Sequence, residues 1–190
     1  FVRGVDWGIE HPTVCLFAQV DVKGHRVHIE DEYVQSGNLI SESVDVIKKK
    51  TGNRVVDWTV CDPSMNKRNS QTPRTDKQEF DRLGIFVIPG DNSNRGYNVV
   101  KMFLKTGMLT INPKCRTLIK QLRDLQWSDK IGDDCTDTLR YMSVRLHDLV
   151  WNGIFDKVKA TEEEKPFQFN LNDVNMFKGG EFRHANQAVE

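Results

Sequence analysis

The sequence predicts an α/β protein with one mixed sheet, in which a three-stranded antiparallel meander is joined to parallel strands and flanked by helices. Two observations predict this class. Apolar and polar side chains alternate through the first part of the chain, and helical and strand-like segments alternate after it. A third observation sets the scale, because 190 residues with 38% hydrophobic side chains can fill one core but not two.

Turns divide the predicted strands. The strands of the meander are expected at residues 1–5, 13–20 and 26–34, with an Asp-Trp-Gly turn after the first and a Lys23-Gly24 turn after the second. Two further strands are expected at residues 55–61 and 85–88. The fourth strand must end before Pro63, because proline cannot continue a hydrogen-bonded ladder. The polar, turn-rich residues 65–77 are expected to form a mobile loop.

Helices are expected between and after these strands. The first begins after Asn38 and ends at Gly52, a short one ends at Leu83, and three more cover residues 97–105, 113–125 and 133–151. Asparagine is a preferred N-cap and glycine accepts the positive φ of a helix exit. This order of elements is that of the ribonuclease H-like fold. We expect one such domain over residues 1–152 and a partly flexible C-terminal extension over residues 153–190, where much of the chain is polar.

Composition argues against several classes of protein. The 27 basic and 27 acidic side chains cancel, so any surface for DNA must come from local segregation of charge. The four cysteines form no CxxC pair, which argues against a zinc site or a disulfide framework and favours a reduced, intracellular protein. No segment has the roughly 20 apolar residues of a membrane span, and phosphate-loop, HExxH and Gly-x-Ser-x-Gly motifs are absent.

Two aspartates stand where predicted strands end. Asp6 follows the first strand and Asp62 the fourth, so both carboxylates leave the sheet at the same edge if these strands are neighbours. Alternation places Asp6 opposite Val5, and Gly4 and Gly8 are expected to leave open space around it. Each aspartate alone is equally compatible with a turn. The coincidence of two such strand ends favours a functional site.

A third acidic group opens the last predicted helix. Asp134 and Asp137 lie three residues apart and share one side of its first turn, whereas Asp133 is assigned to capping. Capping and the helix dipole alone favour aspartates at this position. Two further carboxylates that repel each other exceed what a cap needs, and a bound cation would relieve that repulsion.

Asp6, Asp62, Asp134 and Asp137 are therefore predicted to form a catalytic, metal-binding site. Carboxylate oxygens select Mg²⁺ or Mn²⁺ over softer metals. Two such ions about 4 Å apart suit phosphodiester hydrolysis, because one lowers the pKa of the attacking water and the other stabilises the departing oxygen. Asp6 is expected to bridge both ions.

Basic side chains gather in one part of the sequence. Between residues 95 and 123 there are seven basic residues and no acidic one. Together with the polar loop, they are predicted to track DNA phosphates with little reading of bases, although an ordinary solvated helix face is the alternative. The predicted DNA-binding residues are Lys67, Arg68, Arg74, Lys77, Arg95, Lys101, Lys105, Arg116, Lys120 and Arg123.

Four motifs, taken in order, resemble the nuclease domain of tailed-bacteriophage terminase large subunits, within the ribonuclease H/resolvase-like superfamily. They are GVDWG from Gly4, VCDPS from Val60, NPKCRTLIKQL from Asn112 with a following Trp127, and DDCTDTLRY from Asp133. The resemblance implies a metal-dependent endonuclease that cuts double-stranded viral DNA concatemers during genome packaging. It also implies metal ligands at Asp6, Asp62, Asp134 and Asp137, with a histidine at the position of Asp134 in some relatives.

The resemblance also implies partners. These are an N-terminal ATPase motor domain that is absent from this chain, the portal or procapsid and the small terminase subunit, in the cytoplasm of an infected bacterium. We therefore expect the chain to be an excised domain. A Holliday-junction resolvase or ribonuclease H of the same fold, acting on another substrate, is one alternative. A non-catalytic module that docks on DNA or the portal is another, and it predicts that metal does not bind.

Overall fold

The computed structural model describes residues 1–8, 11–67, 74–124 and 133–150. Over these residues the chain forms one six-stranded sheet with the strand order β5-β4-β1-β2-β3-β6. The strands are β1 (Val2–Asp6), β2 (Thr13–Asp21), β3 (Arg26–Gln35), β4 (Trp58–Cys61), β5 (Ile88–Pro89) and β6 (Leu109–Ile111). The helices are α1 (Ile40–Thr51), the 3-10 helix η1 (Pro63–Asn66), α2 (Asp76–Arg82), α3 (Arg95–Lys105), α4 (Arg116–Asp124) and α5 (Asp134–Val150).

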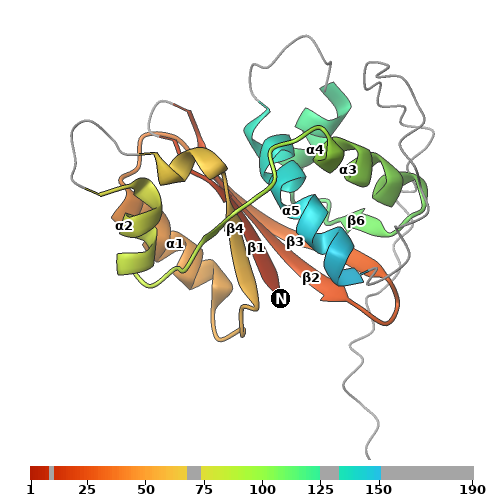
Figure 1. Cartoon of the computed structure of the whole chain (residues 1–190), viewed down its shortest axis with the longest axis horizontal. Coiled ribbons are helices and arrows are strands. Elements are labelled where there is room, and N and C mark those ends of the chain that lie inside the picture. Colours follow the sequence, from red (N-terminus) through yellow and green to blue (C-terminus); the bar gives the residue numbers. More distant parts are fainter. Residues whose placement is uncertain (9–10, 68–73, 125–132, 151–190) are drawn as a thin grey trace, which may run out of the picture.

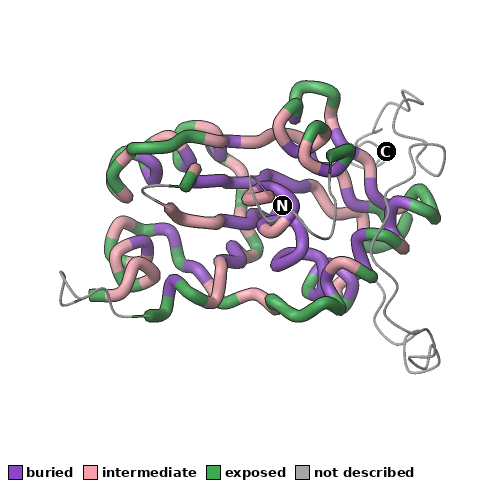
Figure 2. Tube along the Cα trace, turned by 90° about the horizontal axis from the view of Figure 1, so that it is seen from above, coloured by how far each residue is buried: buried purple, intermediate pink, exposed green. Residues whose placement is uncertain are grey.

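Helices cover both faces of the sheet. α1 and α2 lie on one face, and α3, α4 and α5 lie on the other (Figure 1). Side-chain alternation divides β1 between two cores, because Val2 packs with α5 and Val5 packs with α1. Figure 2 shows the buried residues in the central strands and on the inner sides of the helices. No helix of the described residues is long and apolar enough to cross a membrane.

The predicted mixed sheet is confirmed. β1, β2 and β3 form the antiparallel meander, and β4 lies beside β1 in parallel, with Val5 opposite Cys61. β5 adds to β4, and β6 to the far edge at β3, both in parallel. The sequence did not predict β6, because its three residues between two helices are too few to show a period.

Two predicted strands are shorter than expected. β4 begins at Trp58 rather than at Val55, whose side chain is 83% exposed. β5 contains only Ile88 and Pro89, although Ile85 and Val87 are buried in the core beneath α1 and α2. The apolar side chains of residues 85–88 therefore indicated that this segment is buried, but not that it pairs with a neighbouring strand over its whole length.

The ends of several helices differ from the prediction. Leu39, not Asn38, is the N-cap of α1, and the side-chain nitrogen of Asn38 donates to the Tyr33 hydroxyl (3.1 Å). The exit at Gly52 has the expected positive φ, 61°. α4 begins at Arg116 rather than at residue 113, and the two oxygens of Glu32 accept hydrogen bonds from its first-turn amides (2.8 and 2.9 Å).

Two predicted flexible segments lie wholly or partly outside the described residues. The expected mobile loop at residues 65–77 is ordered at both ends, because Met65 is buried in η1 and α2 begins at Asp76. Its residues 68–73 lie outside the described part of the chain. The same holds for the expected extension over residues 153–190.

Glycine at position 4 lets α5 approach β1 closely. A Cβ atom on Gly4 would lie 2.4 Å from Cγ and Sδ of Met142 and 2.9 Å from a methyl group of Thr138. The open space that Gly4 and Gly8 were expected to leave beside Asp6 is therefore filled at these two positions. α5 fills the first space, and the carbonyl oxygen of His11 would lie 2.7 Å from a Cβ on Gly8.

We expect Gly4→Ala to destabilise the domain by about 1–3 kcal/mol, because the added methyl group must displace α5 from the sheet. Urea unfolding of the 190-residue chain would measure the free energy. Met142→Ala in the same background should remove part of the clash, so the double variant should lose less stability than the two single losses added together. Strict additivity would contradict a steric contact between these two positions.

Candidate active site

Asp6 and Asp62 lie at the carboxyl ends of neighbouring parallel strands. Asp6 ends β1 on the side of the sheet that faces α5, and Asp62 follows β4. The Asp62 amide donates to the carbonyl oxygen of Val5 (3.1 Å), which continues the pairing of the two strands. Asp62 also caps a turn, because its Oδ1 accepts from the Ser64 amide (2.7 Å). The turn interpretation therefore holds for one oxygen of Asp62.

Asp134 and Asp137 lie in the first turn of α5, beside these strand ends. The close packing of α5 on β1 at Gly4 brings this turn to the same edge of the sheet. The cap itself comes from α4. The amides of Cys135 and Thr136 donate to Gln121 Oε1 (2.8 and 3.3 Å), so the role assigned to Asp133 is supplied by Gln121.

Hydrogen bonds hold Asp137 on both oxygens. Its Oδ1 accepts from the Tyr97 hydroxyl (2.6 Å) and from Arg140 Nε (2.9 Å). Its Oδ2 lies 3.4 Å from the Tyr141 hydroxyl, which is also 3.3 Å from Asp62 Oδ2. A single hydroxyl therefore lies between the carboxylates of α5 and β4.

Of the four aspartates, Asp6 has the most strongly raised pKa. Burial raises the pKa of its carboxyl from 3.8 to about 8, and repulsion from Asp62, Asp134, Asp137 and Asp133 adds to the shift. Burial likewise raises the pKa of Asp134 and of Asp133. Among the described residues, no donor reaches the Asp6 carboxylate. The four predicted aspartates thus lie close enough to disfavour ionisation of Asp6.

The donor chemistry of this edge fits a hard divalent cation. Half-buried carboxylate oxygens with uncompensated negative charge are what Mg²⁺ and Mn²⁺ prefer. Within the described part of the chain, however, no three Asp, Glu, His or Cys side chains are arranged to hold a metal ion as they stand. Asp62 and Asp137 already accept hydrogen bonds, so we expect their carboxylates to turn when a cation binds.

Sequence reasoning missed the residues that support Asp137. Arg140 is only 8% exposed, and its guanidinium lies over the rings of Tyr97 (5.0 Å) and Tyr141 (4.6 Å). It donates to Asp137 and to the carbonyl oxygen of Asn92. Its spacing of three residues from Asp137 on one helix was a usable signal. Nothing local connects Tyr97 with Asp137, because they are 40 residues apart.

The predicted DNA-binding residues fall into two groups on opposite faces of the sheet (Figure 1). Lys67, Arg74 and Lys77 lie in or near η1 and α2, and Arg68 lies outside the described residues. The other group lies on α3 (Arg95, Lys101, Lys105) and on α4 (Arg116, Lys120, Arg123).

Ion pairs within the protein engage some of these basic side chains. Lys77 pairs with Asp81 (2.6 Å), Arg74 approaches Glu79 (3.8 Å) and Arg95 approaches Asp148 (3.5 Å). The basic side chains of α4 are exposed, as their predicted position opposite Leu118 and Leu122 requires.

A mixed sheet with this strand order, helices on both faces and acidic residues at the ends of β1 and β4 is the ribonuclease H-like arrangement. Solved structures show which branch of that fold it resembles. The chain is similar to the nuclease domain of the phage P22 large terminase, with 15% identity and a TM-score of 0.64 over 78% of this chain and 84% of that one. It is similar to the large terminase of the thermophilic bacteriophage D6E, with 16% identity and a TM-score of 0.64 over 76% of this chain.

A third similar structure is the large terminase nuclease domain of bacteriophage SPP1 with bound Mn, with 12% identity and a TM-score of 0.51 over 75% of this chain and 84% of that one. The chain covers 39% of the D6E protein. No protein family model and no curated protein matches the sequence. The chain therefore has the fold of large-terminase nuclease domains.

Without divalent cations, we expect the domain to lose stability as the pH rises from 5 to 9. The Asp6 carboxyl has a pKa of about 8 when folded and about 3.8 when unfolded, so the folded state binds the extra proton between these values. The stability that this proton provides is complete below the lower value and is lost as the pH passes the upper one. Asp6→Asn should therefore be more stable than the wild type at pH 9, by at least about 1 kcal/mol.

Urea unfolding in EDTA at pH 5, 7 and 9 would measure this difference. Asp45→Asn is a matched control, because Asp45 is an exposed aspartate on α1, on the other face of the sheet. Equal pH dependence in Asp6→Asn and the wild type would show that folding does not disfavour the ionised form of the Asp6 carboxyl.

Proposed function

We propose that the chain is a metal-dependent endonuclease that hydrolyses phosphodiester bonds in double-stranded DNA during viral genome packaging. The observation that carries the proposal is the placement of Asp6 and Asp62 at the ends of the neighbouring strands β1 and β4, beside the first turn of α5 with Asp134 and Asp137. Burial, with repulsion from these neighbours, raises the pKa of the Asp6 carboxyl, in keeping with such a group. The fold of large-terminase nuclease domains supports the proposal independently. The proposed nuclease domain covers residues 1–152, followed by an extension over residues 153–190.

In this proposal Asp6, Asp62, Asp134 and Asp137 would hold the divalent ions, two Mg²⁺ or Mn²⁺. The similar SPP1 domain was solved with Mn. When bound, such ions lower the pKa of an attacking water and stabilise the departing oxygen. The chain's own residues set the positions of the oxygen ligands: Gly4 admits α5, and Arg140 with Tyr97 holds Asp137. No side-chain nucleophile is required.

The surface of α4 is the proposed approach for DNA. Arg116, Lys120 and Arg123 are exposed on it, and the next residue to Lys120, Gln121, caps α5 directly beside Asp134. A phosphate backbone that follows α4 would therefore reach the carboxylates. Lys101 and Lys105 on α3 extend the same side of the sheet, whereas the group near α2 would contact DNA from the other side. Phosphate contacts of this kind imply little sequence specificity.

Partners follow from the size of the similar proteins. Because the chain covers 39% of the D6E large terminase, we propose that an ATPase motor domain accompanies it in the complete protein. The portal or procapsid and the small terminase subunit are further proposed partners, in the cytoplasm of an infected bacterium. A non-catalytic docking module is the second candidate, because hydrogen bonds already engage Asp62 and Asp137.

We expect the 190-residue chain to nick or linearise plasmid DNA with Mn²⁺, and Asp6→Ala and Asp62→Asn each to lower the rate by roughly 100-fold or more, because each removes a proposed ligand. Gel analysis of plasmid conversion measures the rate, and Asp45→Asn should cut like the wild type. Four-way junctions and RNA–DNA hybrids in the same assay separate the resolvase and ribonuclease H alternatives.

Metal binding gives a readout that is independent of cutting. Mn²⁺ should raise the Tm of the wild type and of Asp45→Asn, and should raise it much less in Asp6→Ala. Wild-type protein that neither cuts nor is stabilised by Mn²⁺ would favour the docking module over the nuclease.

We also expect Arg116→Ala combined with Lys120→Ala to weaken duplex binding at every sequence tested. Loss of two phosphate contacts should reduce the slope of log K against log salt concentration by about 2. Fluorescence anisotropy in the Asp6→Asn background measures binding without cleavage. Lys23→Ala combined with Arg26→Ala removes one exposed lysine and one exposed arginine at the turn between β2 and β3, outside the proposed DNA-binding residues, and serves as the control. An unchanged slope in the α4 variant would exclude that helix from the interface.

A further inference from the structure

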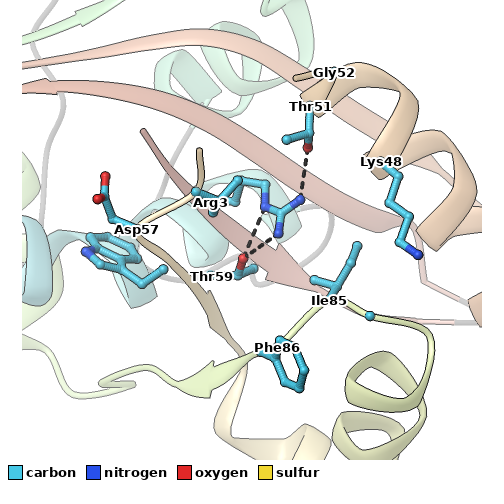
Figure 3. Close-up of a pocket in the computed structure, with 11 residues that line it drawn as sticks. Arg3, Lys48, Thr51, Gly52, Asp57, Thr59, Ile85 and Phe86 are labelled. Atoms are coloured by element: carbon cyan, nitrogen blue, oxygen red, sulfur yellow. Dashed lines mark hydrogen bonds between the residues drawn. The ribbon is translucent and has the colours of Figure 1, made fainter. Parts of the chain in front are cut away.

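A pocket of about 470 Å³ opens at the other end of β1 and β4 from the carboxylates (Figure 3). The first residues of these strands, the end of α1 and the segment that follows α2 surround it. Its lining includes Arg3, Lys48, Thr51, Trp58, Thr59 and Phe86. Arg3 belongs to the face of β1 that packs on α1, whereas Asp6 faces α5. The pocket is therefore separate from the proposed active site.

Arg3 is a buried cation with no carboxylate partner among the described residues. It is 6% exposed, and its three hydrogen bonds go to hydroxyl groups: Nε and Nη2 donate to Thr59 (3.1 and 2.9 Å), and Nη1 donates to Thr51 (2.9 Å). A guanidinium has five N–H groups, so one on each terminal nitrogen remains for another acceptor. Burial without a counter-charge lowers the pKa of Arg3, and Arg54 lowers it further.

The charge around Arg3 is positive on balance. Lys48 lines the pocket from α1 and is exposed. Its ammonium reaches the turn after α2, because Nζ lies 3.3 Å from the position that a Cβ on Gly84 would occupy. Asp57 is the acidic residue of the lining, and its carboxylate points away from Arg3 (Figure 3). An anion that enters the pocket would meet two cations.

An apolar wall stands next to these cations. Ile85 is buried, whereas the ring of Phe86 beside it is 77% exposed. An exposed aromatic ring at the edge of a pocket offers a surface on which a nucleobase stacks. In Figure 3 Arg3 lies between Thr51 and Thr59, with Ile85 and Phe86 on the opposite wall.

We propose that this pocket binds a nucleoside monophosphate, with its phosphate on Arg3 and Lys48 and its base against Phe86. A guanidinium with an N–H group available on each terminal nitrogen suits two oxygens of one phosphate, and the ammonium adds a second charge. The pocket volume accommodates a ligand of this size, and the hydroxyl groups of Thr51 and Thr59 hold the guanidinium in place. This binding requires neither metal nor DNA cleavage.

Isothermal titration of the 190-residue chain with AMP in EDTA tests the proposal, because chelation removes any metal-dependent binding at the carboxylates. AMP should bind, and inorganic phosphate and adenosine should each bind at least about 10-fold more weakly. Lys48→Glu and Phe86→Ala should each weaken AMP binding by about 10-fold, and both side chains are exposed, so the fold should persist. Lys49→Glu makes the same charge change on α1 outside the pocket lining and should bind AMP like the wild type.

Each outcome decides the matter. Absence of AMP binding at millimolar concentrations, or equal weakening by Lys48→Glu and Lys49→Glu, would overturn the site. Equal affinity for AMP and inorganic phosphate would overturn the contact between the base and Phe86. Plasmid cleavage by Lys48→Glu should equal that of the wild type, so failure of this site and failure of the proposed nuclease are distinguishable.

Discussion

The close contact between α5 and β1 at Gly4 is the constraint on which the rest of the structure depends. Because Gly4 has no side chain, Met142 and Thr138 lie directly on the strand, and the first turn of α5 reaches the end of β1. Two more glycines admit the same helix: a Cβ on Gly90 would lie 2.7 Å from Cβ of Tyr141, and one on Gly96 would lie 2.6 Å from Cγ of Arg140. α5 therefore packs directly against the backbone at three glycines, and this packing fixes the position of its acidic first turn.

This arrangement concentrates negative charge at a cost to stability. Asp6 receives the repulsion of its neighbours and has no donor among the described residues, while Arg140 and two tyrosines compensate Asp137. A fold optimised for stability alone would not place carboxylates in this way, because their burial and mutual repulsion both disfavour ionisation. Charge that is unfavourable in the free protein is the property that a cation-binding site needs.

β1 carries opposite charges toward its two ends and on its two faces. Asp6 faces α5 at the carboxyl end, and Arg3 faces α1 near the amino end, because three residues along a strand change both the side and the position. The central strand of the sheet thereby supports a negatively charged edge and a positively charged pocket without direct pairing between them. Asp6 lies beside α5 on one face of the sheet, and Arg3 lies beside α1 on the other (Figure 1).

The sequence by itself determined the meander, the positions of Asp6 and Asp62 at strand ends, and the apolar face of α5, because alternation and helical periodicity are local properties. That β1 and β4 are neighbours is a property of the tertiary structure. Only the tertiary structure decided the rest. β6 is too short to show a period, Gln121 rather than Asp133 caps α5, and Tyr97 meets Asp137 across 40 residues of chain. The predicted basic residues likewise lie on two faces of the sheet, since a continuous run in sequence carries no information about which layer each helix joins.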